Sequence, residues 1–422
     1  MTTTTKDYQD SSNKVFSKFV KTGHYEKDTR GLYGKYDNVR KYWEDKITQY
    51  TIRPHLSKLI EDVGDKMRRI EVCDLGSGTG EGYELLTNTE KEYMDIQSHE
   101  VDLLGYHTIG RYTGVDLSPE MVERANEIYS DSDKLNFRKG DLSKGLPLDK
   151  DDPPYDLYYS SYGSLSHIDD DALKHLLVDI ARHAKNGSVV VGDWLGRYSY
   201  EWPCYWEAKK GKNQMREYTM SWIDPSQEKL EEEKFPLRFW SREELEALIT
   251  EVEKEANVKM QRLTYTDRSV FTGRHMDTAV YNPNAQPIRR VLNSLHADNV
   301  RTDLTNLIID YTPKRGYEEQ NRFFEELQVA WNTLVEFTIE KLKRSKDWKM
   351  PARVETMDLP LKQQVKTMDR VIENVGWMKM GDPRANIIEP QLGYALRELE
   401  MSYQQGKGMA HAILGLFKVV KE

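Results

Sequence analysis

Residues 70–86 read IEVCDLGSGTGEGYELL, and the order of residue types in this stretch decides the fold. A short apolar run includes an acidic residue, three glycines follow at alternate positions, and a helical spacing of apolar residues comes next. The pattern predicts a strand, a tight turn and a helix. Gly76, Gly78 and Gly80 let the turn adopt dihedral angles closed to other residues, and let the backbone approach a ligand at the helix N-terminus.

The spacing of the glycines separates two kinds of nucleotide site. A dinucleotide fingerprint, G-x-G-x-x-G, counted from Gly76 requires a glycine at position 81, where this chain has Glu81. The observed G-x-G-x-G behind Asp74 is similar to the first motif of the class I S-adenosylmethionine-dependent methyltransferases, which this chain resembles. The resemblance implies S-adenosylmethionine as cofactor, with its methionine part on the glycine loop. Glu81, where a dinucleotide fingerprint needs glycine, argues against a dehydrogenase.

Four later segments resemble the remaining motifs of that family in the right order. Residues 111–129 place Asp116 at the end of a second strand, before a Ser118-Pro119 pair suited to begin a helix. Residues 135–145 place Asp141 after a third strand, and residues 155–168 and 186–194 read as the fourth and fifth. The resemblance implies that Asp116 binds the ribose hydroxyls and Asp141 the adenine amino group. The expected cofactor-binding residues are Asp74, Gly76, Ser77, Gly78, Gly80, Asp116, Leu117, Met121, Asp141, Leu142 and Ser160.

The alternation of strands and helices predicts an α/β fold, a Rossmann-like doubly wound sheet of about seven strands. We expect an N-terminal helical cap at 1–60 and a methyltransferase core at 61–275 that carries an aromatic lid at 194–240. A helical subdomain at 276–405 and a final core strand at 406–422 follow. The sequence leaves open whether the helical block is inserted before the last strand, or is appended after two strands that pair within 258–273.

Residues 152–155 read DPPY, a tetrapeptide that resembles the active-site motif of enzymes that methylate base amines in nucleic acids. In those enzymes it lies at the carboxyl end of the fourth strand. Here it precedes that strand, which Asp156 begins, so we expect a turn at the opposite edge of the sheet. Residues 160–167, SSYGSLSH, therefore occupy the active-site position after the fourth strand, and they look like the corresponding loop of small-molecule methyltransferases.

The composition favours a small-molecule partner. The chain has 61 basic and 70 acidic residues, and its net charge of -9 disfavours a nucleic-acid backbone as partner. Its two cysteines, Cys73 and Cys204, have no spacing typical of a disulfide framework or a zinc site. The N-terminal residues lack the apolar stretch of a signal peptide and no apolar run of 18 residues occurs, so we expect a soluble, cytoplasmic protein without a membrane partner.

Aromatic residues concentrate at 194–222, where eight tyrosines and tryptophans occur among 29 residues. Their faces could stabilise a cationic acceptor, or their rings could form the core of a pair of lid helices. Arg274 could clamp a carboxylate or pair with a surface acid, and His167 could act as a general base or be structural. The expected substrate-binding residues are Tyr36, Trp43, Trp194, Tyr200, Trp206, Arg274 and His275, and the expected catalytic residues are His167 and Tyr162.

Together these observations predict methyl transfer from S-adenosylmethionine to an N, O or S nucleophile of a small polar metabolite, an amine or an amino-acid-like compound. Positioning alone can supply much of the acceleration, so a dedicated base is not required, and no metal-ligand cluster is visible. The alternatives are a non-catalytic S-adenosylmethionine-binding interaction protein and a nucleic-acid or protein methyltransferase. The helical subdomain is expected to form a homodimer interface or to support the lid.

Overall fold

The computed structural model describes residues 15, 36–64, 68–92, 101–149, 151–207, 214–220, 233–343, 352–378 and 381–421. Five parallel strands form the main part of one sheet: β1 (Ile70–Leu75), β2 (Ile109–Asp116), β3 (Leu135–Lys139), β4 (Leu157–Tyr159) and β5 (Val189–Gly196). Their spatial order is β3-β2-β1-β4-β5. The sheet is therefore doubly wound, as the alternation of motifs predicts.

Four further strands extend the sheet beyond β5. The last strand, β9 (Ala412–Val420), lies between β5 and β8 (Lys259–Arg268) and runs antiparallel to both. A hairpin of β6 (Met215–Met220) and β7 (Glu233–Trp240) branches from the carboxyl end of β5. Residues 258–273 contain a single strand, so the competing arrangement, in which two strands pair within that range, is wrong. Within the described residues the sheet has nine strands, where about seven were expected.

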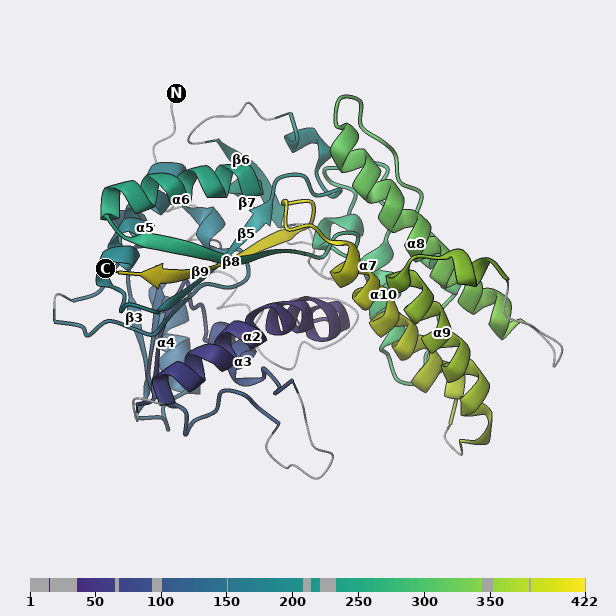
Figure 1. The fold of residues 1–422 in the computed structure, drawn as a ribbon, viewed down its shortest axis with the longest axis horizontal. Helices are drawn as coiled ribbons and strands as arrows, with labels where there is room; N and C mark the ends of the chain where they lie inside the picture. Colours follow the sequence, from purple (N-terminus) through teal and green to yellow (C-terminus); the bar gives the residue numbers. More distant parts are fainter. Residues whose placement is uncertain are drawn as a thin grey trace.

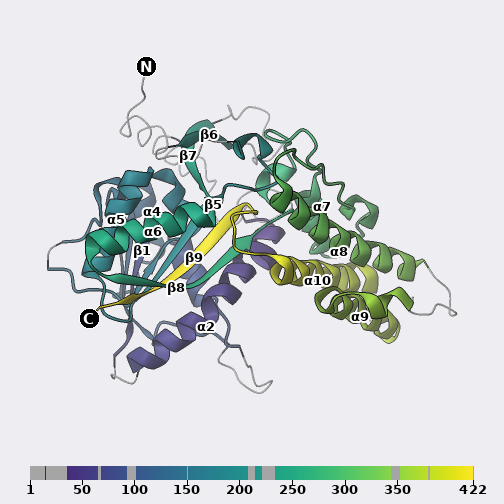
Figure 2. The same ribbon diagram turned by 45° about the horizontal axis from the view of Figure 1, so that its top comes forward.

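Two helical layers cover the sheet, and side chains that alternate along the strands pack into them. Helices α2 (Asp45–Gly64), α3 (Glu81–Thr87) and α4 (Pro119–Ile128) share a core with Leu157 and Tyr159 of β4. Helices α5 (Asp170–His183) and α6 (Arg242–Ala256) share a second core with Tyr158, the residue between them. This alternation is the period of two that a buried strand requires. Figure 2 shows α5 and α6 on the face opposite to α2.

Local sequence signals fix several of these elements. Ser118 accepts a hydrogen bond from the Met121 amide and Pro119 occupies the first turn of α4, as expected. Ser241 and Glu244 form a reciprocal capping box at the start of α6. The DPPY tetrapeptide precedes β4, and Asp152 accepts a hydrogen bond from Arg138 at 2.5 Å. It therefore lies at the edge of the sheet opposite to the carboxyl ends of the strands.

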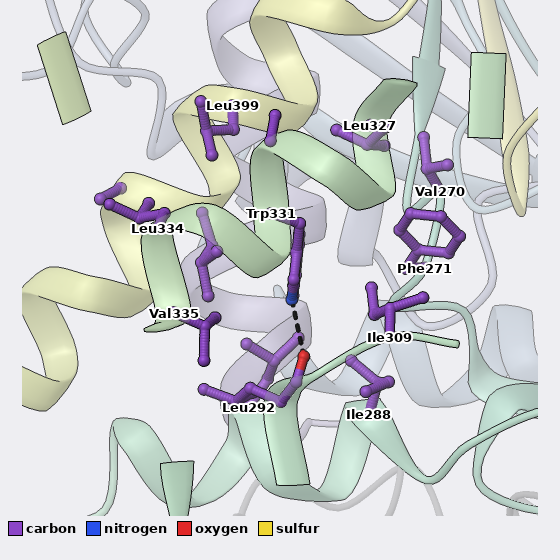
Figure 3. Packing of buried hydrophobic residues seen from close by; sticks show 14 of the residues in the cluster. Val270, Phe271, Ile288, Leu292, Ile309, Leu327, Trp331, Leu334, Val335 and Leu399 are labelled. Carbon is purple, nitrogen blue, oxygen red and sulfur yellow. Dashed lines mark hydrogen bonds between the residues drawn. The ribbon is translucent and has the colours of Figure 1, made fainter. Parts of the chain in front are cut away.

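A block of four helices separates β8 from β9 in the chain: α7 (Ile288–Leu295), α8 (Glu318–Leu342), α9 (Leu359–Asn374) and α10 (Glu389–Tyr403). Figure 3 shows its core, in which the indole nitrogen of Trp331 donates a hydrogen bond to the Leu307 carbonyl at 2.8 Å. Val270 and Phe271, directly beyond β8, belong to the same core. The block therefore packs onto the end of the sheet (Figure 1).

A buried ionic cluster joins this block to the N-terminal segment. The Arg289 guanidinium of α7 donates to both carboxylate oxygens of Asp37 at 2.7 and 2.8 Å, to Glu44 at 2.7 Å, and to the Thr272 carbonyl at 2.9 Å. Glu44 ends the short helix η1 (Arg40–Glu44), which leads into α2. Residues 1–35 of the expected cap lie outside the described part of the chain, apart from residue 15.

Candidate functional site

A cavity of about 270 Å³ lies at the carboxyl edge of the parallel strands, where open α/β sheets bind their ligands. Loops after β1, β2, β3 and β4 form one part of its wall. The remaining wall comes from η1, the end of β5, the β6–β7 hairpin, the residues after β8 and the residues that begin β9. One cavity therefore joins the motif loops to segments from both ends of the described chain.

The glycine loop after β1 has the backbone that its sequence predicts. Gly76, Gly78 and Gly80 all have positive φ angles, of 77°, 55° and 100°. A Cβ atom on Gly76 would lie 2.6 Å from the Cβ of Ser164, so the two loops approach more closely than a side chain permits. The backbone amides of Gly76 and Ser77 donate to the Val115 carbonyl at 2.8 and 3.0 Å. These contacts hold the loop over the end of β2.

The two acidic residues that follow β2 and β3 line the same cavity. Asp116 accepts hydrogen bonds from the amides of Gly78 and Ser118, both at 2.9 Å, so its carboxylate links the glycine loop to the start of α4. Burial alone would raise the pKa of Asp141, but hydrogen bonds from Ser143 and its pairing with Lys144 lower it. Asp141 is therefore ionised at neutral pH and able to accept from an amino group.

This part of the cavity fits the cofactor that the resemblance implies. The hydroxyl of Ser77 is buried and has no hydrogen-bond partner within the described chain, so it is available to a ligand. A Cβ atom on Gly78 would lie 2.8 Å from a Glu81 carboxylate oxygen, so the loop has room for backbone and ligand only. The expected cofactor-binding residues that line the cavity are Gly76, Ser77, Gly78, Asp116, Leu117, Met121, Asp141 and Leu142.

Three other expected cofactor contacts lie beneath the cavity wall. Asp74 is fully buried and accepts a hydrogen bond from the Tyr112 hydroxyl at 2.5 Å, and burial raises its pKa to about 7. Gly80 packs against the Tyr129 ring, and the Ser160 hydroxyl donates to the Leu75 carbonyl at 2.9 Å. None of the three is among the described residues that line the cavity. Their geometry supports the loop.

Both expected catalytic residues reach the cavity from the loop after β4. The Tyr162 hydroxyl donates to Asp45 at 2.9 Å, and the Arg40 guanidinium lies 4.1 Å from the centre of the Tyr162 ring. His167 stacks on Phe235 with ring centres 5.4 Å apart, and burial lowers its pKa to about 4. The His167 imidazole is therefore neutral at pH 7 and a weak base.

Three arginines line the cavity and are called the arginine wall below: Arg40 and Arg268, which are buried, and Arg274, whose side chain is 12% exposed. Arg268 pairs with the fully buried Asp193 at 2.9 Å, Arg40 with Asp45 at 3.8 Å, and Arg274 with Glu44 at 3.6 Å. Arg274 thus pairs with a buried acid and not with the surface acid considered above. Such guanidinium groups are suited to bind a carboxylate.

The β6–β7 hairpin supplies a second, apolar wall. Tyr218 and Met220 of β6, and Phe235 and Leu237 of β7, line the cavity beside Leu195 of β5. These five residues, called the hairpin wall below, belong to one buried hydrophobic cluster. The described part of the expected lid is thus built from two strands and not from a pair of helices. Residues 208–213 and 221–232 of that lid lie outside the described residues.

Most of the expected substrate-binding residues are not in the cavity wall, and those expectations need correction. Trp43, Tyr200 and Trp206 are buried in the helical-block core, because this core reaches across to η1 and to the segment after β5. Trp194 packs in the core beneath α5 and α6. Each of these large rings fills a core where the helical block or a helical layer meets the sheet.

Of the remaining expected substrate contacts, Arg274 alone lines the cavity within the described residues. Tyr36 lies behind the wall, with its hydroxyl donating to Glu81 at 3.3 Å. His275 is fully buried, and its backbone amide donates to Glu201 at 2.7 Å. Arg274 lies in the segment that follows β8 and lines the cavity, whereas the side chain of its neighbour is buried in the protein.

Several polar residues of the cavity were not expected from the sequence, among them Arg40, Glu44, Arg268 and His411. Arg40 and Glu44 sit on η1, which tertiary contacts hold at the site, among them the hydrogen bond from Arg289 to Glu44. His411 precedes β9, whose antiparallel direction brings its start to the carboxyl edge of β5. That signal was available, because a final strand inserted antiparallel to β5 has to begin at the ligand edge.

No group of three or more histidine, cysteine, aspartate or glutamate side chains in the described part of the chain is arranged to hold a metal ion. No described helix combines the length and the apolar character needed to cross a membrane.

Comparison with known proteins matches residues 72–187 to a methyltransferase domain family. No curated protein matches the chain. A structure containing the Haloferax volcanii Trm112 methyltransferase activator matches with a TM-score of 0.35 and 20% identity, over 62% of this chain and 80% of the matched chain. An S-adenosylmethionine-dependent methyltransferase from Clostridium acetobutylicum matches with a TM-score of 0.33 and 18% identity, over 51% and 83% of the two chains. The CcbJ methyltransferase from Streptomyces caelestis gives 0.32 and 13%, over 46% and 74%.

Proposed function

Because residues 72–187 form a class I methyltransferase domain whose cofactor is S-adenosylmethionine, we propose that this chain methylates a small molecule. The acceptor carries its N, O or S nucleophile on a compound with a carboxylate and an apolar part, as in an amino-acid-like metabolite. The cofactor supplies an electrophilic methyl group on a sulfonium. The protein's own residues have to bind and orient the acceptor and keep water out.

The observation that carries the proposal is the juxtaposition of the arginine wall and the hairpin wall in the cavity of the glycine loop. A carboxylate would be favoured by Arg268 and Arg274, whose guanidinium groups are removed from bulk water. The apolar part of the acceptor would be favoured by Phe235 and Leu237, the two residues of the hairpin wall that lie on β7. An acceptor held at both ends has its nucleophile fixed between them, which is the positioning that methyl transfer needs.

The cavity also supports a small acceptor over a macromolecular one. Its volume is about 270 Å³, and its walls belong to buried cores of the same chain. The net charge of -9 opposes a nucleic-acid backbone. Metal independence, a cytoplasmic location and a homodimer through the helical block stay predictions, and chelator treatment, localisation and light scattering test them in that order.

Calorimetry tests the cofactor half first. Wild type should bind S-adenosylmethionine and S-adenosylhomocysteine, and Asp116→Ala should weaken both about 10- to 100-fold, because hydrogen bonds to a charged group contribute about 1.5–3 kcal/mol. Unchanged affinity in Asp116→Ala would contradict the placement of the cofactor. An unfolded variant is recognised by circular dichroism.

Labelled methyl transfer tests the acceptor half. The panel pairs amino acids and hydroxybenzoates with their methyl esters, which lack the carboxylate charge. We expect the free acids to be methylated, and Arg274→Met to raise their KM with little change in S-adenosylhomocysteine affinity. Arg262→Met is the matched control, because Arg262 lies on β8 with half of its side chain exposed and pairs with Glu246 on the surface.

The panel also separates the alternatives. Binding of cofactor with no transfer to any small acceptor would favour a non-catalytic binding protein. Transfer to nucleic acid that weakens steeply with added salt would favour a nucleic-acid enzyme. Equal transfer to acids and to their esters would overturn the role of the arginine wall and leave the methyltransferase assignment intact.

A further inference from the structure

The geometry points to His411 as the general base of the reaction, held in place by Glu201, and thus to an acceptor that loses a proton as it is methylated. This inference rests on the proposed methyl transfer. It assigns a role to a histidine outside the methyltransferase motifs, on the segment that begins the last strand. It also narrows the acceptor to a hydroxyl, a thiol or a protonated amine.

The backbone fixes His411 at the ligand edge of the sheet. Its amide donates to the Ser269 carbonyl beyond β8, and its carbonyl accepts from the Gly196 amide at the end of β5, both at 3.0 Å. The next residue, Ala412, pairs with Leu195 of the hairpin wall. His411 is therefore held from both sides, between the ends of two strands whose carboxyl edge faces the cavity.

His411 also lies on the acceptor side of the site. The order of neighbouring strands is β1, β4, β5, β9, and adjacent strands lie about 4.8 Å apart. Ser164, in the loop after β4, contacts Gly76 of the glycine loop, and Gly163 lies beside Leu195 of β5. The cofactor loop, the β4 loop and His411 thus follow one another across the mouth of the sheet.

Glu201 gives the imidazole a defined tautomer. Its side chain is fully buried, and one oxygen lies 2.8 Å from Nδ1 of His411. The amide of His275 donates to the other oxygen at 2.7 Å, and the Ser199 hydroxyl donates at 3.2 Å to the oxygen that faces His411. Burial alone would raise the pKa of Glu201, but His411 and the hydrogen bond from the His275 amide lower it, so the carboxylate is ionised. An ionised carboxylate only accepts, so Nδ1 carries the proton and the lone pair is on Nε2.

The Nε2 atom is the part of His411 that the protein leaves available. The His411 side chain is 12% exposed and lines the cavity, and no described residue makes a hydrogen bond to Nε2. The charged groups that face the imidazole are the Glu201 and Asp193 carboxylates, with His275 behind Glu201. Asp193 is itself paired with Arg268 of the arginine wall, which links the base to the expected carboxylate site.

Other cavity groups are poorer bases. Burial lowers the pKa of His167 to about 4, which leaves its neutral ring with little affinity for a proton. Glu44 accepts from Arg289 and faces Arg274, and these cations hold its pKa well below its usual value despite burial. The Tyr162 hydroxyl is engaged with Asp45, and burial raises its pKa. Among the described cavity residues, His411 therefore combines a free lone pair with an anionic support.

The step balances without any further reactant. The X–H bond of the acceptor breaks and its proton moves to Nε2 of His411. The electron pair on X forms the new bond to the methyl carbon, the methyl–sulfur bond breaks, and S-adenosylhomocysteine leaves. Glu201 stabilises the imidazolium that forms, and this cation afterwards returns its proton to water.

Nitrogen NMR on the full chain labelled at histidine tests the tautomer without any acceptor. In the complex with S-adenosylhomocysteine, assigned by comparison with His411→Gln, we expect a proton on Nδ1 and none on Nε2 at pH 8. Glu201→Gln should mix the two tautomers. A proton on Nε2, or protonation of both nitrogens up to pH 9, would overturn the proposal, because His411 would then be a structural ion-pair partner.

Kinetics with a methylated acceptor from the panel test the role. His411→Gln should lower kcat about 10²- to 10⁴-fold, abolish the fall of kcat/KM on the acidic side, and leave S-adenosylhomocysteine affinity within twofold. Added imidazole should restore part of the rate in His411→Ala. The control is His107→Gln, an exposed position in the loop before β2. Retention of kcat and of the acidic limb in His411→Gln would refute the assignment.

Failure of the proposed methyl transfer and failure of the assignment of His411 as base give different results. Failure of the proposed function appears as absent cofactor binding or as a panel without transfer, whatever the tautomer of His411. Failure of the base appears as a wrong tautomer or as undiminished turnover in His411→Gln, while wild type still methylates its acceptor.

Discussion

Replacement of Arg289 by methionine probes the buried cluster that holds η1 against the helical block. The change removes four hydrogen bonds, two to Asp37, one to Glu44 and one to the Thr272 carbonyl. Asp37 and Glu44 are 3% and 5% exposed, so their charges stay buried after the arginine has gone. Asp37 keeps the hydrogen bonds from the Arg40 backbone amide and from the Asn293 side chain. Glu44 keeps Arg274 as a neighbouring cation.

Removal of one partner from a buried ion pair costs about 3–5 kcal/mol, because it leaves an uncompensated charge. The unfolding entropy grows with chain length by about 2.1 cal/mol/K per residue, so a chain of 422 residues that unfolds as one unit loses roughly 1 °C of Tm for each kcal/mol. We therefore expect Tm to fall by about 3–6 °C. Urea denaturation and calorimetry measure the loss. Arg290→Met is the control, because its side chain is exposed on the same helix and surface changes usually stay within about 0.5 kcal/mol.

The pH dependence of the unfolding free energy tests whether the ionised carboxylates of Asp37 and Glu44 cause the loss of stability. Burial would raise the pKa values of Asp37 and Glu44, but Arg289 and Arg274 lower both. A lowered folded-state pKa contributes stability that is present above the unfolded value, near 4, and is lost as the pH falls through the folded value. The gap in unfolding free energy between wild type and Arg289→Met should therefore be largest at neutral pH and shrink toward pH 4 and below. A gap below about 1 kcal/mol at neutral pH, or a gap that stays constant from neutral pH down through the acid range below pH 4, would refute this reasoning.

Three further changes test the fold. Gly80→Ala should destabilise the protein by at least about 1–3 kcal/mol in a thermal-shift assay. The φ angle of Gly80 is +100°, and a Cβ atom there would lie 2.4 Å from the Tyr129 ring. Gly64→Ala is the control and should be neutral, because its Cβ atom would have nothing within 4 Å. The folded state holds the Asp74 proton to higher pH than the unfolded chain, so wild type should lose stability as the pH rises from about 4 to about 7. Asp74→Asn should not show this loss. If the unfolding free energy of Asp74→Asn still fell over that pH range in denaturation experiments, the prediction would be contradicted. Trp331→Phe should cost at least about 1–3 kcal/mol by leaving the Leu307 carbonyl without its donor, and an unchanged urea midpoint would argue against that hydrogen bond.

The fold was predictable where the signals are local. The glycine turn, the Ser118 cap and the capping box of Ser241 and Glu244 each depend on residues within a few positions of one another, and the structure contains all of them. The position of DPPY followed from its order relative to Asp156. The alternation of apolar runs and helical patterns gave the doubly wound sheet for the same reason.

The acceptor half was harder to predict because its residues meet only through tertiary packing. Arg40, Arg268 and His411 come from three segments that are distant in the sequence. The aromatic enrichment after β5 was a misleading signal, because Tyr200 and Trp206 serve the core of the helical block. Without knowledge of that core, a cluster of rings next to an active-site loop looks like a ligand surface.

The place of β9 has a consequence for how the protein is made. Its two partner strands, β5 and β8, are both synthesised before the helical block, yet neither has its β9 edge covered until residues 412–420 emerge. A ribosome-bound chain therefore carries open strand edges, a known aggregation hazard, throughout synthesis of the helices. His411 arrives with the same strand. A chain that stops short of it would keep its glycine loop and lack the imidazole beside Leu195.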